Sequence, residues 1–316
     1  LAAVADQILA VFARPFVLGG RAHYVTVSIG VSCYPQDGSD PDTLLRSAES
    51  ATGRAQGAGG NSYQFYSPEL YAIAVETLHL RNGLRQAIEK NQFHLGYQPR
   101  VDVASGAIKG VEVLLRWNHP EVGIVPPAKF IPIAEQAGII DTIGDWVMRE
   151  ACTQMQSWLA AGLKPFRLAV NLSARQLRRA DLTQRIAVIL KQTGMDARHL
   201  ELEITESTLM EDPDRAVVLL QELRKMGIQV TLDDFGIEYS SLRYLKQFPL
   251  DYMKIDQSFM RGIPGARDDV AIAKAIITLA KNLGLRVIAE GVETGRQLAF
   301  LVEQRCEEYQ GSLFSR

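Results

Sequence analysis

The sequence predicts an α/β protein in which a modified TIM (βα)8 barrel follows a smaller, partial α+β domain. From residue 94 onward, short runs rich in β-branched residues alternate with helical patterns, and this alternation is typical of parallel βα units. Eight such runs match the strand count of a TIM barrel. The connection from Val103 to Gly110 is too short for a parallel crossover, so we expect the first strand to run antiparallel to the second.

The expected barrel strands share a high content of aliphatic and aromatic residues and are bounded by turn residues. They lie at 97–103, 110–117, 167–173, 200–207, 229–235, 252–258, 286–292 and 310–314. The helical patterns between most of them lie at 141–161, 174–192, 214–226 and 268–282.

The segment before the barrel has a different pattern. We expect a first helix, an alternating strand over 24–34, a helix over 42–54 and a glycine-rich loop over 57–61 that leads into 63–66. Ser67 as N-cap and Pro68 as first helical residue then predict a long helix to about Asn91. Because one helix commonly joins two domains, we divide the chain into residues 1–66, a linker helix over 67–92 and a barrel over 93–316.

Composition narrows the function classes. The 316 residues are 47% hydrophobic and 22% charged, which excludes global disorder, and the net charge of −2 gives no basic excess for binding a nucleic-acid polymer. Cys33, Cys152 and Cys306 are odd in number, widely spaced and without a CxxC pattern, so no disulfide framework is expected, which favours a reducing, cytoplasmic location. Charges and a proline interrupt the apolar stretch 1–18, so we expect no membrane contact from this segment, although a parent protein could be tethered upstream.

Polar side chains recur at the carboxyl ends of the expected strands, where TIM barrels carry their catalytic residues. Acidic residues are disfavoured in strands and costly to bury without a partner, so their repetition points to a common function rather than to separate solvent-facing positions. These residues are Glu112, Asn171, Glu203, Glu206, Asp233, Asp234, Lys254, Asp256, Glu290, Glu293 and Gln310.

Such a donor set is suited to hard divalent cations. Carboxylates and amides without His or Cys favour Mg²⁺ or Mn²⁺ over zinc. Adjacent Asp233 and Asp234 would allow one carboxylate to bridge two ions, and two ions can act together on a phosphoester. Lys254 is expected to hold the attacking water or contact a phosphate, which is compatible with a salt bridge to the acids. Glu206, three residues after Glu203, should point to the opposite strand face and suits a supporting role.

From about residue 80 to the end, the residues and their order resemble the EAL domain. The motifs that carry the resemblance are Gln98-Pro99, Glu112-Val-Leu-Leu-Arg-Trp117, Val125-Pro-Pro-Ala-Lys-Phe-Ile-Pro132, Asn171-Leu-Ser173, Glu203-Ile-Thr-Glu206, Asp233-Asp-Phe-Gly236, Lys254-Ile-Asp256, Ala289-Glu-Gly-Val-Glu293 and Gln310-Gly. The resemblance implies divalent-metal-dependent hydrolysis of cyclic di-GMP to linear pGpG in bacterial second-messenger signalling.

The same resemblance implies roles for individual residues. One ion would be held by Glu112, Asn171, Glu203 and Asp233, and a second by Asp233, Asp234 and Glu290. The implied catalytic residues are Glu290, Lys254 and Asp234, the implied substrate contacts are Gln98, Arg116, Glu293 and Gln310, and Glu206 would brace the loop after the fifth strand. The family also implies a homodimer formed through the barrel.

One loop departs from the family pattern. Ile237 and Glu238 replace the usual Thr and Gly after Asp233-Asp-Phe-Gly236. If that glycine requires a positive φ, Glu238 costs roughly 1 kcal/mol or more and could shift the loop. The loop is thought to couple dimerisation to metal binding, so activity or its regulation is in question here.

The first part resembles the C-terminal half of a GGDEF (diguanylate cyclase) domain, through Val27-Ser-Ile-Gly-Val31, Tyr34-Pro-Gln-Asp-Gly38 and Gly59-Gly-Asn-Ser-Tyr63. The signature Gly-Gly-Asp-Glu-Phe is absent from the sequence. We therefore expect no dinucleotide synthesis from this segment.

Two alternatives to hydrolysis remain open. The chain could be a non-hydrolysing cyclic di-GMP receptor, or a purely structural or dimerisation module. Retention of the whole acidic set favours the hydrolase, because receptors of this type usually lose several of these acids.

Overall fold

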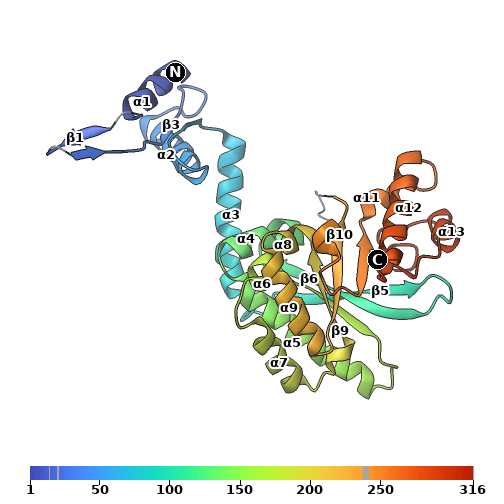
Figure 1. Ribbon diagram of the computed structural model, residues 1–316. Helices are drawn as coiled ribbons and strands as arrows, with labels where there is room; N and C mark the ends of the chain where they lie inside the picture. Colours follow the sequence, from blue (N-terminus) through green and yellow to red (C-terminus); the bar gives the residue numbers. More distant parts are fainter. Residues whose placement is uncertain (14, 20, 238–241, 316) are drawn as a thin grey trace. The chain divides into compact units, whose positions relative to one another are not determined.

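The computed structural model describes all residues except 14, 20, 238–241 and 316 (Figure 1). The chain forms two compact units, Leu1–Asn82 and Gly83–Arg316. Helix α3 (Pro68–Ala87) contains residues of both units and ends before the predicted Asn91. Among the described residues, no helix is both long and apolar enough to cross a membrane.

The first unit is a small α+β assembly. Its elements are α1 (Ala2–Phe12), β1 (Phe16–Leu18), β2 (Arg21–His23), β3 (Ile29–Val31), α2 (Pro41–Gly57) and β4 (Tyr63–Phe65). Strand β3 pairs with β4 in parallel, and the prediction of one strand over 24–34 was wrong in length. The antiparallel β1–β2 hairpin was not predicted, because each strand has three residues and too few positions to show alternation. Asp40 caps α2 by accepting a hydrogen bond from the Thr43 N–H.

The second unit contains a closed barrel. Within its described residues, eight strands form the ring in the spatial order β5-β13-β12-β11-β10-β9-β8-β6, and β6 pairs back with β5. The strands are β5 (Phe93–Asp102), β6 (Ile108–His119), β8 (Arg167–Asn171), β9 (Leu200–Thr205), β10 (Gln229–Phe235), β11 (Tyr252–Ile255), β12 (Arg286–Ala289) and β13 (Glu308–Tyr309). Strand β5 runs antiparallel to both neighbours and the remaining ring pairs are parallel, so the predicted modified barrel is confirmed.

Helices connect the parallel strands, and a short strand β7 (Gly123–Val125) lies outside the ring and pairs antiparallel with the end of β6. The helical elements are α4 (Pro127–Gln136), α5 (Ile140–Ala160), α6 (Ala174–Leu177), α7 (Leu182–Thr193), the 3-10 turn η1 (Ala197–His199), α8 (Glu206–Met210), α9 (Pro213–Lys225), α10 (Leu242–Leu245), α11 (Gln257–Arg261), α12 (Arg267–Asn282) and α13 (Gly295–Glu303). Side-chain hydrogen bonds cap the N-termini of several of these helices. Ser173 with Gln176, and Thr294 with Gln297, form reciprocal capping boxes at α6 and α13.

Several strands end earlier than their apolar patterns predicted. The expected strand 200–207 ends at Thr205, because the Thr205 side chain accepts a hydrogen bond from the Thr208 N–H and caps α8. The expected strand 310–314 is instead the two-residue β13, which ends immediately before Gln310. These shorter strands leave polar residues at or just beyond the carboxyl end of the barrel.

Candidate functional site

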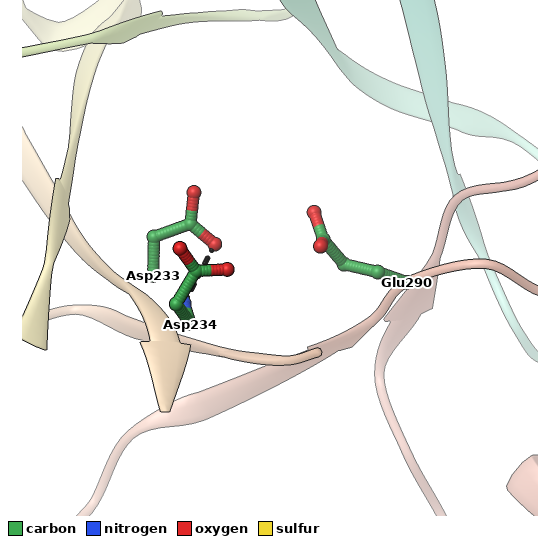
Figure 2. A group of neighbouring side chains, drawn as sticks. All are labelled: Asp233, Asp234 and Glu290. Carbon is green, nitrogen blue, oxygen red and sulfur yellow. Dashed lines mark hydrogen bonds between the residues drawn. The ribbon is translucent and has the colours of Figure 1, made fainter. Parts of the chain in front are cut away.

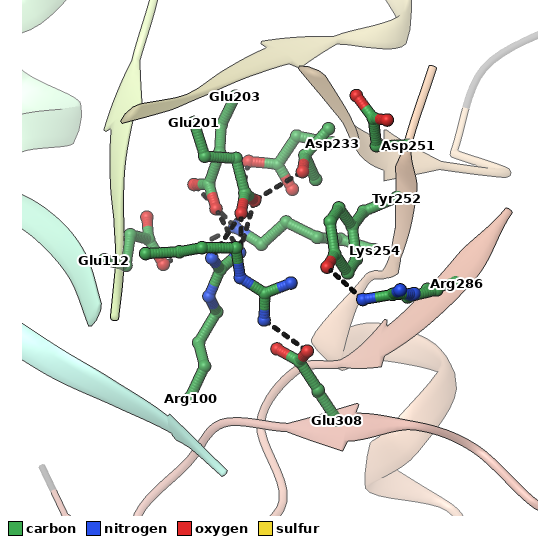
Figure 3. A network of polar contacts seen from close by, with 12 residues as sticks. Arg100, Glu112, Glu201, Glu203, Asp233, Asp251, Tyr252, Lys254, Arg286 and Glu308 are labelled. Atoms are coloured by element: carbon green, nitrogen blue, oxygen red, sulfur yellow. Dashed lines mark hydrogen bonds and ion pairs between the residues drawn. The ribbon is translucent and has the colours of Figure 1, made fainter. Parts of the chain in front are cut away.

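The carboxyl ends of the parallel strands bring seven of the predicted polar residues into one cluster in the barrel mouth. Four of them are buried and come from β6, β9, β10 and β11, namely Glu112, Glu203, Asp233 and Lys254 (Figure 3). Gln310, directly after β13, is also buried. Asn171 and Glu290 complete the cluster from the end of β8 and the residue after β12. The structure therefore brings these seven side chains together.

The Lys254 side chain lies at the centre of the cluster. Its Nζ is 2.7 Å from Glu290 Oε1, 3.0 Å from Glu203 Oε2, 3.2 Å from Asp233 Oδ2 and 3.4 Å from Glu112 Oε2. Burial disfavours the charged ammonium, but the surrounding carboxylates outweigh it and hold the pKa of Lys254 well above its usual value. A single lysine ammonium group thus forms ion pairs with four carboxylates.

A β-bulge places two consecutive carboxylates on the same side of β10. In a regular strand, adjacent side chains point to opposite faces. Here Leu232 pairs with Met253 but Phe235 pairs with Ile255, so β10 contains one extra residue, and Asp234 takes a positive φ of 56°. Asp233 and Asp234 therefore both lie opposite Glu290, as Figure 2 shows. One carboxylate oxygen from each of the three lies within 4.8 Å of the others.

Burial, together with nearby like charges, raises the pKa values of three of these acids. Burial, reinforced by Asp233, raises the pKa of Asp234 to about 6. Burial raises the pKa of Glu290 to about 7, against the opposing effect of Lys254. Burial and the neighbouring Glu112 raise the pKa of Glu203 well above its usual value. The raised pKa values indicate that Lys254 does not fully neutralise the negative charge of these carboxylates. Oxygen ligands of this kind fit a divalent cation.

Two amides connect the acids. The Asn171 Nδ2 donates to Glu112 Oε1 at 2.9 Å, and the Gln310 Nε2 donates to Glu112 Oε2 at 2.7 Å and to Glu290 Oε1 at 2.9 Å. Burial raises the pKa of Glu112, but Lys254 and these two amides overcome it and lower the pKa to about 2. Glu112 is thus held as a carboxylate whose two oxygens have fixed partners.

The other predicted substrate contacts lie around this cluster. Gln98 on β5 is the register partner of Glu112, and its Nε2 donates to the Ser315 carbonyl at 3.5 Å. Arg116, with Asn171, lines a cavity of about 350 Å³ bounded by residues of β6, α4, α5 and α6. Glu293 is exposed, and its N–H donates to Gln297 Oε1 at the start of α13, so its position separates it from the buried acids.

Glu206 corrects one detail of the sequence analysis. It does not lie on the strand face opposite Glu203, because β9 ends at Thr205 and Glu206 is the first residue of α8. Its buried Oε2 accepts a hydrogen bond from the Gly236 N–H at 3.3 Å, immediately after the bulge. Glu238 lies outside the described residues, and the Ile237 side chain is exposed.

The sequence analysis missed a second buried charge group below the cluster. Arg100 on β5 donates through Nη1 and Nη2 to both carboxylate oxygens of Glu201, and its Nη1 also lies 3.3 Å from Glu203 Oε1. A signal was available, because Arg100 follows Gln98 by two residues and Glu201 precedes Glu203 by two. In a strand this spacing puts each pair on the same face.

Comparison with known proteins identifies the fold family. The family model of the EAL domain matches residues 81–316, and that of the diguanylate cyclase GGDEF domain matches residues 1–62. The chain belongs to the EAL domain family.

Relatives with this EAL domain include two curated phosphodiesterases. The chain is 44% identical over 313 residues to the cyclic di-GMP phosphodiesterase NbdA of Pseudomonas aeruginosa, covering 99% of the chain and 40% of that protein. It is 36% identical over 316 residues to the cyclic di-GMP phosphodiesterase PdeR of Escherichia coli, covering 100% of the chain and 48% of that protein. The chain thus spans less than half of either relative.

A solved structure described as the PaMucR phosphodiesterase in complex with c-di-GMP superposes on the EAL domain. Its TM-score is 0.73 at 45% sequence identity, and the match covers 75% of this chain and 96% of that one. The FimX EAL domain from Pseudomonas aeruginosa, bound to c-di-GMP, matches with a TM-score of 0.68 at 27% identity, covering 74% and 94% of the two chains.

Proposed function

We propose that this chain hydrolyses cyclic di-GMP to linear pGpG with the help of divalent cations. The observation that carries the proposal is the excess of buried carboxylates in the barrel mouth, where Lys254 is shared by four acids and Asp234 adds a fifth beside Asp233. Buried uncompensated charge is costly, so a site of this kind is suited to cations from solution. The names of the relatives supply the substrate class.

The carboxylates and amide divide into two ligand groups around Asp233. Glu112, Asn171, Glu203 and Asp233 would hold one cation, and Asp233, Asp234 and Glu290 the other, with Mg²⁺ or Mn²⁺ as the ions. When bound, such ions supply positive charge to a phosphodiester and lower the pKa of water. The bulge is the local feature that places Asp234 on the same side of β10 as Asp233, so that both carboxylates can contribute to the second group.

The remaining residues bind and orient the reactants. Lys254 donates to Glu290, and together these two side chains would position the attacking water. Attack on phosphorus breaks the P–O3′ bond, and the departing O3′ takes a proton to leave a free hydroxyl on pGpG. Arg116, Gln98, Gln310 and Glu293 would contact the dinucleotide. Glu206 would keep the segment after β10 in place through Gly236.

The direct test is product analysis. The protein is incubated with cyclic di-GMP and Mg²⁺ or Mn²⁺, and the nucleotides are separated and identified by mass. We expect one pGpG for each cyclic di-GMP consumed, and none after chelation of the metal. Recovery of intact, tightly bound cyclic di-GMP would instead support a non-hydrolysing receptor, and absence of binding would support a structural module.

Three finer statements remain proposals. We propose the division into a GGDEF-like part (1–66), a linker helix (67–92) and an EAL barrel (93–316), homodimerisation through the barrel and a cytoplasmic location.

A further inference from the structure

The charge group that the metal-site assignment does not use is the buried pair formed by Arg100 and Glu201. Both side chains have no exposed area, and they come from different strands, β5 and β9. The Arg100 guanidinium engages Glu201 through both terminal nitrogens, which is the bidentate geometry that fixes an arginine in one orientation. Thr231 and Arg167 also contact the Glu201 carboxylate, so Glu201 is held from several sides.

The orientation of Arg100 has a consequence for Glu203. The Arg100 Nη1 lies 3.3 Å from Glu203 Oε1, while Lys254 Nζ lies 3.0 Å from Glu203 Oε2. The two carboxylate oxygens of Glu203 therefore have different partners, with Oε1 bound by Arg100 and Oε2 by Lys254 (Figure 3). Arg100 thus supplies one of the contacts that fix the orientation of the Glu203 carboxylate.

We propose that Arg100 is a positioning residue of the metal centre, which presents one oxygen of Glu203 to the cations and is itself fixed by Glu201. The inference rests on the metal site of the proposed function. Arg100 acts through orientation more than through charge, because Glu201 neutralises it in a buried pair. Groups that orient metal ligands in this way typically change metal affinity by about 10–100-fold when they are removed.

Replacing Arg100 and Glu201 together distinguishes an effect of orientation from an effect of charge. The double variant Arg100→Gln/Glu201→Gln leaves the net charge unchanged and replaces the ion pair by two amides that can hydrogen-bond to each other. The single Arg100→Gln variant leaves the buried Glu201 without its arginine partner on β5 and is expected to lower the Tm by roughly 10 °C. Arg286→Gln is the control, because Arg286 donates a hydrogen bond to Tyr252 Oη at the edge of the same polar network, is exposed, and forms no hydrogen bond or ion pair with Glu203 in the described structure.

The experiment is calorimetric titration of each metal-free protein with Mn²⁺. We expect the Kd of the double variant to rise by about 10–100-fold while Arg286→Gln binds as the wild type does. A folded double variant whose Kd stays within about threefold of the wild type would overturn the inference, as would equal weakening in Arg286→Gln. Absence of Mn²⁺ binding in the wild type would instead defeat the proposed metal site, on which this inference depends.

Arg100→Lys keeps the test decisive if the double variant does not fold. Lysine keeps the positive charge beside Glu201 but has no planar fork, so it cannot hold Glu201 through two parallel bonds and also reach Glu203 in the same geometry. We expect this variant to fold and to bind Mn²⁺ more weakly than the wild type. Wild-type affinity in Arg100→Lys would show that charge alone is sufficient and would contradict a positioning role.

Discussion

Buried charges lie at both ends of the barrel interior, but they are balanced at one end and not at the other. Toward the amino ends of the parallel strands, Glu201 pairs with Arg100, and Glu308 pairs with Arg167. In the mouth, four carboxylates share Lys254. An acid that is paired with an arginine is already neutralised, whereas a surplus of buried acids favours binding of an additional cation. The comparison separates charges that support the fold from those that bind and react.

The largest effect is expected from the residue common to both ligand groups. Asp233→Asn should lower phosphodiesterase activity by about a thousandfold or more, because the shared carboxylate is lost. The Tm of the metal-free variant should equal or exceed that of the wild type, since one like charge leaves the cluster. Steady-state hydrolysis and thermal unfolding in chelator measure the two effects. A large fall in Tm together with the lost activity would show that Asp233 supports the fold instead.

At the amino ends of the parallel strands, where acids pair with arginines, a substitution should reduce stability more than activity. Glu308→Gln removes one of the two acids that pair with the largely buried Arg167, the other being Glu201, and we expect a loss of about 2 kcal/mol in the free energy of unfolding. Activity at a temperature where the variant is folded should stay within about threefold of the wild type. Urea unfolding and a hydrolysis assay provide the two measurements. Strongly reduced activity in folded Glu308→Gln would remove the distinction between the two ends.

The bulge allows a finer test within the mouth. Asp234→Asn keeps a residue type that tolerates positive φ, so the backbone should keep its conformation while one anionic ligand is lost. We expect activity to fall by roughly a hundredfold, with stability unchanged within about 0.5 kcal/mol. Asp234→Gly is the control for the backbone and should show the same loss of activity. If Asp234→Asn hydrolyses cyclic di-GMP at the wild-type rate, the second ligand group is incorrectly assigned.

The smallest effect is expected for Glu206, whose side chain holds the segment that follows the bulge. Glu206→Gln retains the shape of the side chain but weakens the acceptor for the Gly236 N–H, which we expect to cost about 1 kcal/mol of stability. Activity should fall by less than in Asp234→Asn, because Glu206 lies in no proposed ligand group. Parallel unfolding and hydrolysis measurements check this order, and its reversal would place Glu206 closer to the chemistry than the structure does.

Much of this organisation could be predicted from residue patterns, and the exceptions have physical causes. The alternation of apolar runs and helical patterns predicted the barrel, and the short link before Gly110 predicted its antiparallel strand. Acidic residues at strand ends predicted the cluster. The pattern could not show that the backbone takes a positive φ at Asp234, because that conformation depends on pairing with β11.

Two other features depended on tertiary contacts. Arg100 is one arginine in an expected strand, and its burial is explained only by Glu201 on another strand. Glu293 was expected at the end of the seventh strand, but β12 ends at Ala289, and the chain turns into the cap of α13 and leaves Glu293 exposed. Sequence proximity to a ligand therefore does not predict the direction of the next side chains once the strand has ended.

The central claim is that the uncompensated acids of the mouth hold two divalent cations. Titration of the metal-free protein with Mn²⁺, followed by calorimetry, measures both stoichiometry and affinity. The account predicts two ions per chain in the wild type and greatly weakened binding in Asp233→Asn. Failure of the wild type to bind Mn²⁺, or binding that is the same in Asp233→Asn, would contradict it.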